Sequence, residues 1–203
     1  MRLPDPFRYP DEPHVRRHGP RGYAKYGQYR DWLRDEFRFR CVFCLVREQW
    51  TQCKSLFDID HWEPRVLKPD LTNNYDNLLY ACRTCNSDKS SSLVPDPCKC
   101  AYGESLKVHD DGTIHALNTH GEILIDELDL DDSRRNEFRK WLIATVQLVA
   151  EHGTKEHLVH YLGLPENLPD LKRKPPGGNS RVEGLQDTWH ARSSRGELPD
   201  IFE

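Results

Sequence analysis

Apolar side chains recur at spacings of three and four residues shortly after a polar N-terminal stretch. The spacing places them on one face of a helix that we expect to begin at Tyr23. These apolar positions are Tyr26, Tyr29, Trp32, Leu33 and Phe37. The pattern predicts a helix that packs against the rest of the protein.

A β-hairpin and a short helix are predicted in the middle of the chain. Alternating apolar residues in 105–108 and 113–117 flank an Asp-Gly turn at Asp111 and Gly112, which is typical of a hairpin. Thr119 is a suitable N-cap for a short helix that would run to Leu128.

A longer helix is predicted next, with Ser133 as its N-cap and Gly153 at its end. We expect its buried face to carry Phe138, Trp141, Leu142, Thr145 and Val149. Residues 154–162 predict a last short helix.

Between Phe57 and Ser91 the pattern changes from strand to helix. Apolar and polar residues alternate from Phe57 and predict a strand that ends at Asp60 and His61. Residues 77–81 predict a second short strand, and residues 86–91 predict the first turns of a helix. The order strand, loop, strand, helix predicts a small α+β core.

We therefore divide the chain into four parts. They are an extended basic arm (1–22), a core with its leading helix (23–92), a hairpin and helical extension packed on that core (93–164), and a flexible polar tail (165–203). The tail has a few apolar anchors, which are Leu185, Trp189, Leu198 and Phe202.

Composition excludes some classes of protein. The chain of 203 residues is 36% hydrophobic and 10% aromatic, which argues against general disorder. No apolar run is long enough to cross a membrane, and the first ten residues do not resemble a secretory signal. We therefore expect a cytoplasmic protein.

The net charge of -4 is divided along the chain. Residues 1–47 carry eleven Arg or Lys against six acids, whereas residues 101–139 carry ten acids against four bases. The basic part could meet nucleic acid, and the acidic part could face away from it or toward a protein partner. The alternative is that both are ordinary solvated surface.

Four of the seven cysteines form two C-x-x-C pairs, Cys41 with Cys44 and Cys82 with Cys85. Each pair can hold one side of a tetrahedral Zn²⁺, and two pairs complete a closed structural site with no open position. A redox pair or buried thiols are the alternatives.

The other three cysteines are Cys53, Cys98 and Cys100. A second metal bound by these three lacks an evident fourth ligand, and free thiols are the alternative. The sequence does not decide between them.

The segment from residue 39 to residue 92 resembles the zinc-knuckle form of the HNH endonucleases, which have a ββα-metal fold. The resemblance rests on Asp60 and His61, then Asn77, then Asn86 directly after the second cysteine pair. Many members have His where this chain has Asn86, and the Asn variant also occurs in the family.

The resemblance implies a role for each matching residue. Asp60 and Asn86 would bind a catalytic divalent cation, His61 would be the general base, and Asn77 would hold the loop that orients His61. Beyond these roles, Lys89, one helical turn after Asn86, and Arg83, within the second cysteine pair, could contact substrate phosphate, with solvated surface charge as the alternative for both. The cation would be Mg²⁺ or Mn²⁺, with Ni²⁺ or Zn²⁺ as alternatives.

The function that the resemblance implies is hydrolysis of DNA phosphodiester bonds. A non-catalytic zinc-stabilised module that binds nucleic acid or docks another protein is the alternative. The layout also loosely resembles stand-alone bacterial HNH proteins, some encoded beside an ATPase in phage-defence systems such as Septu. An ATPase or other protein partner and an oligomer are thus further hypotheses.

Overall fold

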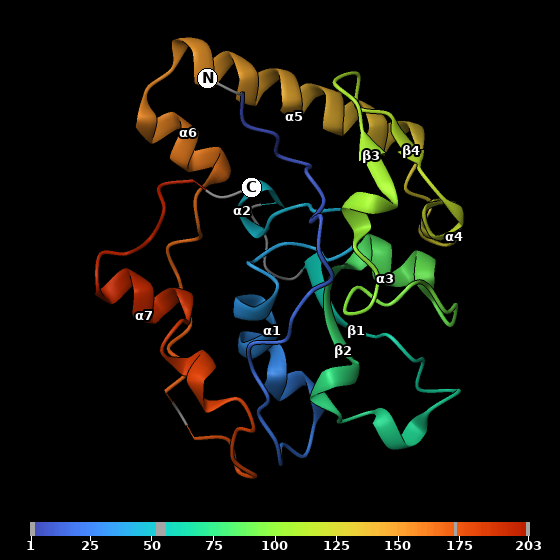
Figure 1. Ribbon diagram of the computed structural model, residues 1–203, viewed down its shortest axis with the longest axis vertical. Helices are drawn as coiled ribbons and strands as arrows, with labels where there is room; N and C mark the ends of the chain where they lie inside the picture. The colour runs from blue at the N-terminus through green and yellow to red at the C-terminus, as the bar shows by residue number, and fades with distance from the viewer. Residues whose placement is uncertain (1–2, 52–55, 173, 202–203) are drawn as a thin grey trace.

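The computed structural model describes residues 3–51, 56–172 and 174–201, and it combines several helices with two small antiparallel sheets (Figure 1). The 3₁₀ helices are η1 (Tyr26–Tyr29), η3 (Pro69–Leu71), η4 (Tyr75–Asn77), η5 (Tyr102–Glu104) and η6 (Val182–Leu185). The α-helices are α1 (Arg30–Glu36), α2 (Glu48–Thr51), α3 (Arg83–Lys89), α4 (Thr119–Leu128), α5 (Ser133–His152), α6 (Lys155–Leu162) and α7 (Trp189–Ser194). The strands are β1 (Phe57–His61), β2 (Leu78–Cys82), β3 (Leu106–Val108) and β4 (Ile114–Ala116).

The centre of the molecule is the antiparallel pair β1 and β2, against which α3 and α1 pack (Figure 1). Asp60 lies opposite Leu79, and His61 lies opposite Leu78. All five residues of β2 are buried, and the ring of Phe57 stacks on Tyr80 with 5.1 Å between centroids. The predicted α+β fold with a ββα core is confirmed.

Helix α3 begins earlier than the sequence pattern indicated. We expected a helix from Asn86 onward, but it begins at Arg83 and contains the second cysteine pair. Cys82 is its N-cap, and its Sγ accepts a hydrogen bond from the backbone N–H of Cys85 at 3.5 Å. The usual cap residues could not reveal this start, because the N-cap is a cysteine rather than Ser, Thr, Asp or Asn.

The predicted leading helix consists of η1 followed by α1, and one of its faces is buried. Tyr29, Trp32, Leu33 and Phe37 all have at most 5% of their surface exposed, whereas Tyr26 is half-buried. These residues join the strands and the cysteine turns in one hydrophobic core.

The predicted hairpin is confirmed, but the caps of the two helices after it are one residue earlier than expected. β3 pairs with β4, with Leu106 opposite Ala116. Asn118 rather than Thr119 caps α4, because its side chain accepts from the N–H of Gly121 at 3.1 Å. Asp132 rather than Ser133 caps α5 in the same way.

The buried face of α5 also differs from the expected one. Its buried residues are Arg139, Leu142, Ile143 and Val146. Trp141 is 60% exposed and Phe138 is 36% exposed. The helix has apolar residues on more than one side, so its periodicity left the buried face open and tertiary packing selected it.

Within the described residues 165–172 and 174–201, η6 and α7 form, and α7 contacts α1. Trp189, one of the predicted anchors, is 5% exposed and donates through its backbone N–H and Nε1 to Asp35 at 2.8 and 3.0 Å. Thr188 caps α7 and is also buried.

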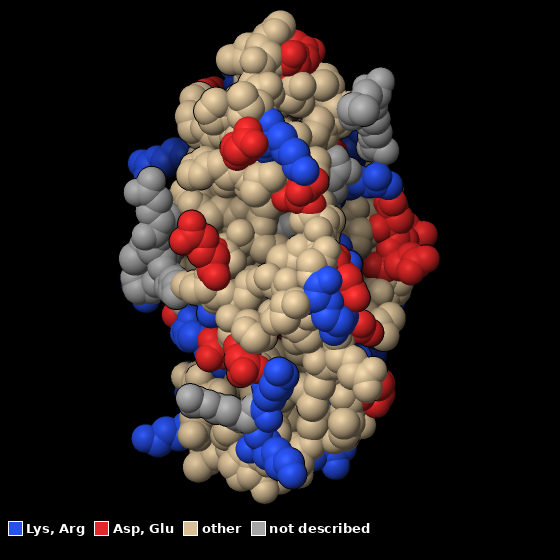
Figure 2. Space-filling view, turned by 90° about the vertical axis from the view of Figure 1, so that its left-hand side faces the viewer, with Lys and Arg blue, Asp and Glu red and all other residues tan. Residues whose placement is uncertain are grey.

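The molecular surface carries both signs of charge. On the face in Figure 2, Lys and Arg side chains lie among Asp and Glu, with broad uncharged areas between them. None of the helices in the described segments combines the length and apolar character needed to cross a membrane.

Candidate active site and metal centre

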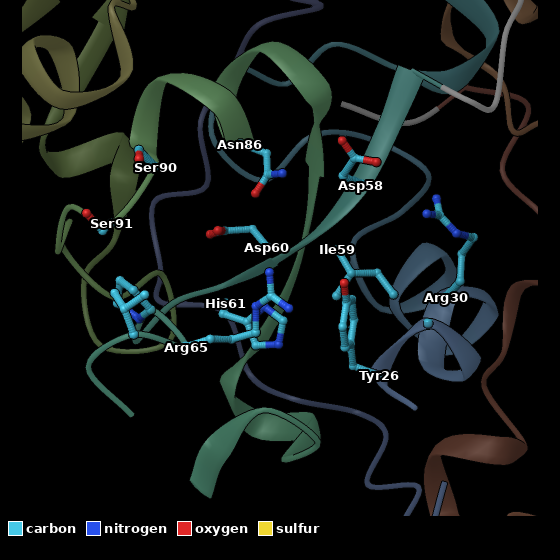
Figure 3. Close-up of a pocket in the computed structure, with 13 residues that line it drawn as sticks. Tyr26, Arg30, Asp58, Ile59, Asp60, His61, Arg65, Asn86, Ser90 and Ser91 are labelled. Atoms are coloured by element: carbon cyan, nitrogen blue, oxygen red, sulfur yellow. The ribbon is translucent and has the colours of Figure 1, made fainter. Parts of the chain in front are cut away.

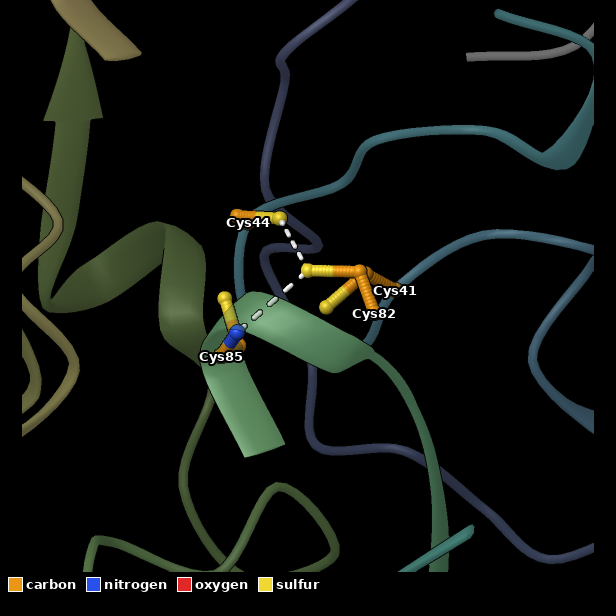
Figure 4. Close-up of side chains that lie close together, drawn as sticks. All are labelled: Cys41, Cys44, Cys82 and Cys85. Atoms are coloured by element: carbon orange, nitrogen blue, oxygen red, sulfur yellow. Dashed lines mark hydrogen bonds between the residues drawn. The ribbon is translucent and has the colours of Figure 1, made fainter. Parts of the chain in front are cut away.

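The two C-x-x-C pairs come together at the start of α3 (Figure 4). The four sulfur atoms, from Cys41, Cys44, Cys82 and Cys85, all lie within 4.8 Å of one another. The Sγ atoms of Cys44 and Cys82 are 3.6 Å apart. One pair lies on the turn before α2, and the other spans the first turn of α3.

This arrangement fits a tetrahedral zinc site. A zinc–sulfur distance of about 2.3 Å places the sulfurs of a regular tetrahedron roughly 3.8 Å apart. Burial, followed by the neighbouring sulfurs, raises the pKa of Cys41, whereas hydrogen bonds from the other three thiols lower the pKa of Cys82. Four thiolates so close together repel one another unless a cation lies among them.

Helix α5 supports this cysteine site from outside. Arg135 donates from Nη1 to the Sγ of Cys85 at 3.2 Å and forms an ion pair with Asp88 of α3. From the N-terminal arm, the hydroxyl of Tyr9 donates to the carbonyl of Phe43 at 2.7 Å. Distant parts of the chain therefore hold the cysteine turns in place.

The remaining cysteines show no comparable cluster. In the part of the chain that the structure describes, the four clustered cysteines form the one group of three or more Cys, His, Asp or Glu side chains suited to an ion. Cys100 contacts Nδ1 of His120 at 3.3 Å, and Cys98 lies nearby in sequence. Cys53 lies outside the described residues, so a second metal site stays a hypothesis.

A cavity of about 410 Å³ opens beside β1 and α3 (Figure 3). Asp60, His61 and Asn86 all line it, so the fold brings together three residues that the sequence placed up to 26 positions apart. In Figure 3 the side chains of Asp60 and Asn86 extend into the same space from the strand and the helix.

His61 is held in a defined orientation. Its Nε2 lies 3.0 Å from the carbonyl oxygen of Thr72, which can only accept, so Nε2 donates and Nδ1 of the neutral ring carries no proton. Burial lowers the pKa of His61, and the charges of Arg65 and Lys89 lower it further, against the hydrogen bond to Thr72. The neutral imidazole is therefore favoured near pH 7.

Asp60 is buried beside the ammonium group of Lys89. It is 3% exposed, and both of its oxygens lie 3.3 Å from Nζ of Lys89. Oδ2 accepts no hydrogen bond within the described segments. Burial raises the pKa of Asp60, although the charge of Lys89 opposes this. A buried carboxylate oxygen without a hydrogen bond suits a cation ligand.

Asn77 ties the loop between the strands. Its Oδ1 accepts from the N–H of Glu63 at 2.8 Å, and its Nδ2 donates to the carbonyl of Glu63 at 3.0 Å. This loop also contains Thr72, the partner of His61. Asn77 does not line the cavity.

The two expected phosphate contacts lie in different surroundings. The side chain of Lys89 is fully buried and donates to the carbonyl of His61 at 2.9 Å as well as contacting Asp60. Arg83 is exposed and pairs with Asp58 at 3.4 Å. Neither residue lines the cavity.

Several lining residues were not selected from the sequence. Arg30 lines the cavity from the start of α1, and Arg65 lines it from the loop after β1. Ser90, with φ of 47°, and Ser91 line it after α3. Arg30 lies on another element, far from Asp60 in the sequence, so local spacing could not connect the two, whereas Arg65 lies five positions after Asp60 in a loop whose path the pattern does not predict.

The strand-loop-strand-helix unit beside a four-cysteine cluster that could hold zinc has the layout of a small ββα domain. Residues 41–92 match the family model of the HNH endonucleases, and this part of the chain is an HNH domain. The match covers both cysteine pairs and the ββα unit, and leaves the arm and the C-terminal helices outside. No curated protein matches the chain.

Proposed function

We propose that this protein is a divalent-metal-dependent endonuclease that hydrolyses phosphodiester bonds in DNA. The observation that carries the proposal is the placement of Asp60, His61 and Asn86 around one open cavity in an HNH domain. His61 is the general base, and Asp60 and Asn86 are the ligands of the catalytic cation.

The geometry of His61 suits the removal of a proton from water. Nδ1 takes the proton while the hydrogen bond from Nε2 to Thr72 keeps the ring in place. Oxygen of the water bonds to phosphorus, the bond from phosphorus to the 3′ oxygen breaks, and that oxygen takes up a proton from a solvent water molecule. A divalent cation held by Asp60 and Asn86 supplies charge stabilisation for the phosphoryl oxygens. The products are a 5′-phosphate and a 3′-hydroxyl.

Basic side chains of the cavity provide the contacts for the DNA backbone. Arg30 and Arg65 line it, and Arg65 lies over the ring of Tyr26, 5.5 Å from the centroid. Tyr26 in turn makes an edge contact with His61, with centroids 4.8 Å apart. We assign Lys89 to Asp60 rather than to phosphate, because its buried ammonium keeps that carboxylate ionised and oriented.

The test is cleavage of supercoiled plasmid with Mg²⁺, Mn²⁺ or Ni²⁺. We expect nicked or linear product from wild type, and a loss of at least a hundredfold in His61→Ala. His157→Ala, which changes an exposed histidine of α6, is the matched control and keeps its activity. Zinc content measured on each variant separates loss of catalysis from loss of the fold.

Two results would contradict the proposal. Equal cleavage by wild type and His61→Ala would remove His61 from the reaction. DNA binding that survives in both, with no cleavage in any metal, would favour the non-catalytic nucleic-acid-binding module.

A role as the nuclease subunit of an anti-phage complex is a separate hypothesis. The net charge of -4 supports it, since a partner would then help to deliver DNA. Co-purification from the native host with an ATPase or another protein tests it, and a chain recovered alone and fully active argues against it.

A further inference from the structure

A second cavity, of about 590 Å³, shares no lining residue with the candidate active site. It lies between the N-terminal arm, the end of α1, the first cysteine turn and the segment around Pro97 to Tyr102. Arg38 and Arg40 line it together with the aromatic rings of Phe37 and Tyr102. Its volume is in the range of cavities that hold small ligands.

Arg40 is buried in this cavity without a partner. Its side chain is 6% exposed, and Nη1 is enclosed with no hydrogen bond. Across the described segments, its guanidinium forms neither an ion pair nor a side-chain hydrogen bond. Arg34 is equally buried, yet it binds both oxygens of Glu48 at 2.8 Å. A buried guanidinium ordinarily has such a partner.

Arg38 is a neighbouring charge of the same sign as Arg40. Burial, followed by the charge of Arg38, lowers the pKa of Arg40 to about 10. Both residues line the same cavity. Two neighbouring guanidinium groups favour binding of an anion.

The carboxylates of the cavity wall do not neutralise these arginines. Glu36 accepts from His14 at 3.1 Å and from Tyr75 at 2.9 Å. Asp11 is paired with Arg8 at 2.7 Å. The third carboxylate, Glu12, is exposed, and within the described residues none of the three forms an ion pair with Arg38 or Arg40.

We propose that this cavity binds a phosphate-bearing ligand, with Arg40 and Arg38 holding the phosphate and the rings of Phe37 and Tyr102 providing an apolar wall. Guanidinium groups match phosphate oxygens with paired hydrogen bonds, and such contacts are strongest where water is excluded. The phosphate belongs either to a free nucleotide or to the end of a DNA strand. The site needs no divalent cation and does not depend on the proposed nuclease activity.

The test is the rise in melting temperature of the full chain with added ligand, without divalent salts and without chelator so that the cysteine site keeps its zinc. The probes are inorganic phosphate, 5′-deoxynucleotides, and one short oligonucleotide with either a 5′-phosphate or a 5′-hydroxyl. A response to mononucleotides identifies a free nucleotide. A response only to the 5′-phosphorylated oligonucleotide identifies a DNA end.

Variants separate this cavity from the active site. We expect Arg40→Met and Arg38→Gln to weaken binding at least tenfold, and His61→Ala to bind as wild type does. Arg38 is exposed, so Arg38→Gln remains a fair test if Arg40→Met fails to fold. Arg195→Gln, which changes an exposed arginine paired with Glu197, is the matched control.

The proposal is overturned if none of the phosphate probes raises the melting temperature. It is also overturned if Arg38→Gln and a folded Arg40→Met bind the probes as tightly as wild type, or if His61→Ala abolishes binding. In the last case the phosphate would lie in the catalytic cavity.

Discussion

Buried charges at single residues govern much of the chemistry of this protein, because each must find a partner or remain costly. Arg34 forms an ion pair with Glu48, and Lys89 forms one with Asp60. Glu36 accepts four hydrogen bonds, from His14, Tyr75 and the backbone N–H groups of Arg17 and His18. Arg40 is the exception among these residues, and its lack of a partner within the described residues supports the proposed phosphate site in the second cavity.

Lys89→Met tests the partner of Asp60. Removing the ammonium leaves a buried carboxylate uncompensated, so we expect the free energy of unfolding to fall by about 3 to 5 kcal/mol. Urea denaturation without added Mg²⁺ measures it. Lys155→Met, which breaks an exposed pair with Asp200, is the control and is expected to leave the free energy of unfolding nearly unchanged. Equal losses in the two variants would contradict a special role for Lys89.

Glu36→Gln tests stability against pH. Burial alone would raise the pKa of Glu36, but the hydrogen bond and charge of His14 and the charges of Arg16 and His18 lower it to about 2. The folded state therefore prefers the ionised form, and this stability is present above about pH 4.3 and lost as the pH falls toward 2.

We expect wild type to exceed Glu36→Gln by on the order of 3 kcal/mol at pH 7. The difference should shrink between pH 4 and pH 2. Denaturation curves at pH 7, 4 and 2.5 measure it, and a constant difference across that range would show that the charge of Glu36 is not the cause.

At the scale of elements, the cysteine site depends on a helix that lies outside the HNH domain. α5 begins at Ser133, yet Arg135 reaches the Sγ of Cys85 and the carboxylate of Asp88. Groups that hydrogen-bond to metal ligands fix the orientation of those ligands and raise the affinity for the metal. The first turn of α5 is therefore a support for α3.

Arg135→Gln measures that support. We expect zinc to be lost to a chelator ten to a hundred times more readily than from wild type, because the hydrogen bond to Cys85 is gone. Zinc release followed with a colorimetric chelator gives the affinity. Arg134→Gln, one residue earlier and exposed, is the matched control.

Cys82→Ser is the reference for complete loss of the zinc site in the same experiment. It should carry no zinc and lose solubility, since binding of a structural ion contributes to folding. An unchanged zinc affinity in Arg135→Gln would leave its contact with Cys85 without a function.

At the scale of the whole molecule, the two ends of the chain meet around α1. The arm lies against it through Arg17, which donates to Asp35 at 3.1 Å, and α7 lies against it through Trp189. Arg17 also lies over the ring of Trp189, 5.5 Å from its centroid. These contacts border the arginines of the second cavity, so the ends of the chain help to shape it.

Trp189→Ala tests the docking of α7. Loss of a buried indole and of its Nε1 hydrogen bond to the carbonyl of Asp35 should lower the free energy of unfolding by about 3 to 5 kcal/mol. Trp141→Ala, at a position that is 60% exposed, should change it by less than about 0.5 kcal/mol. Thermal unfolding of both variants decides the point, and equal losses would mean that α7 does not stabilise the fold.

The sequence alone determined the features that depend on short spacing. Two C-x-x-C pairs specify a four-thiolate site because two residues between ligands set the turn geometry, and alternation followed by Asp60 and His61 specifies a strand ending at a polar pair. The leading helix, α3 to α6 and the hairpin followed from caps, turns and periodicity, to within a residue or a few, whereas α2 and α7 were not predicted.

Only the tertiary structure decided where each charge lies. The burial of Lys89 on Asp60, the solitary position of Arg40, and the exposure of Trp141 all depend on which elements pack together. A chain with apolar residues on several sides of a helix, and with charges on every element, permits many such packings. Competition among them for burial and for ion-pair partners selects one, and no local pattern contains that information.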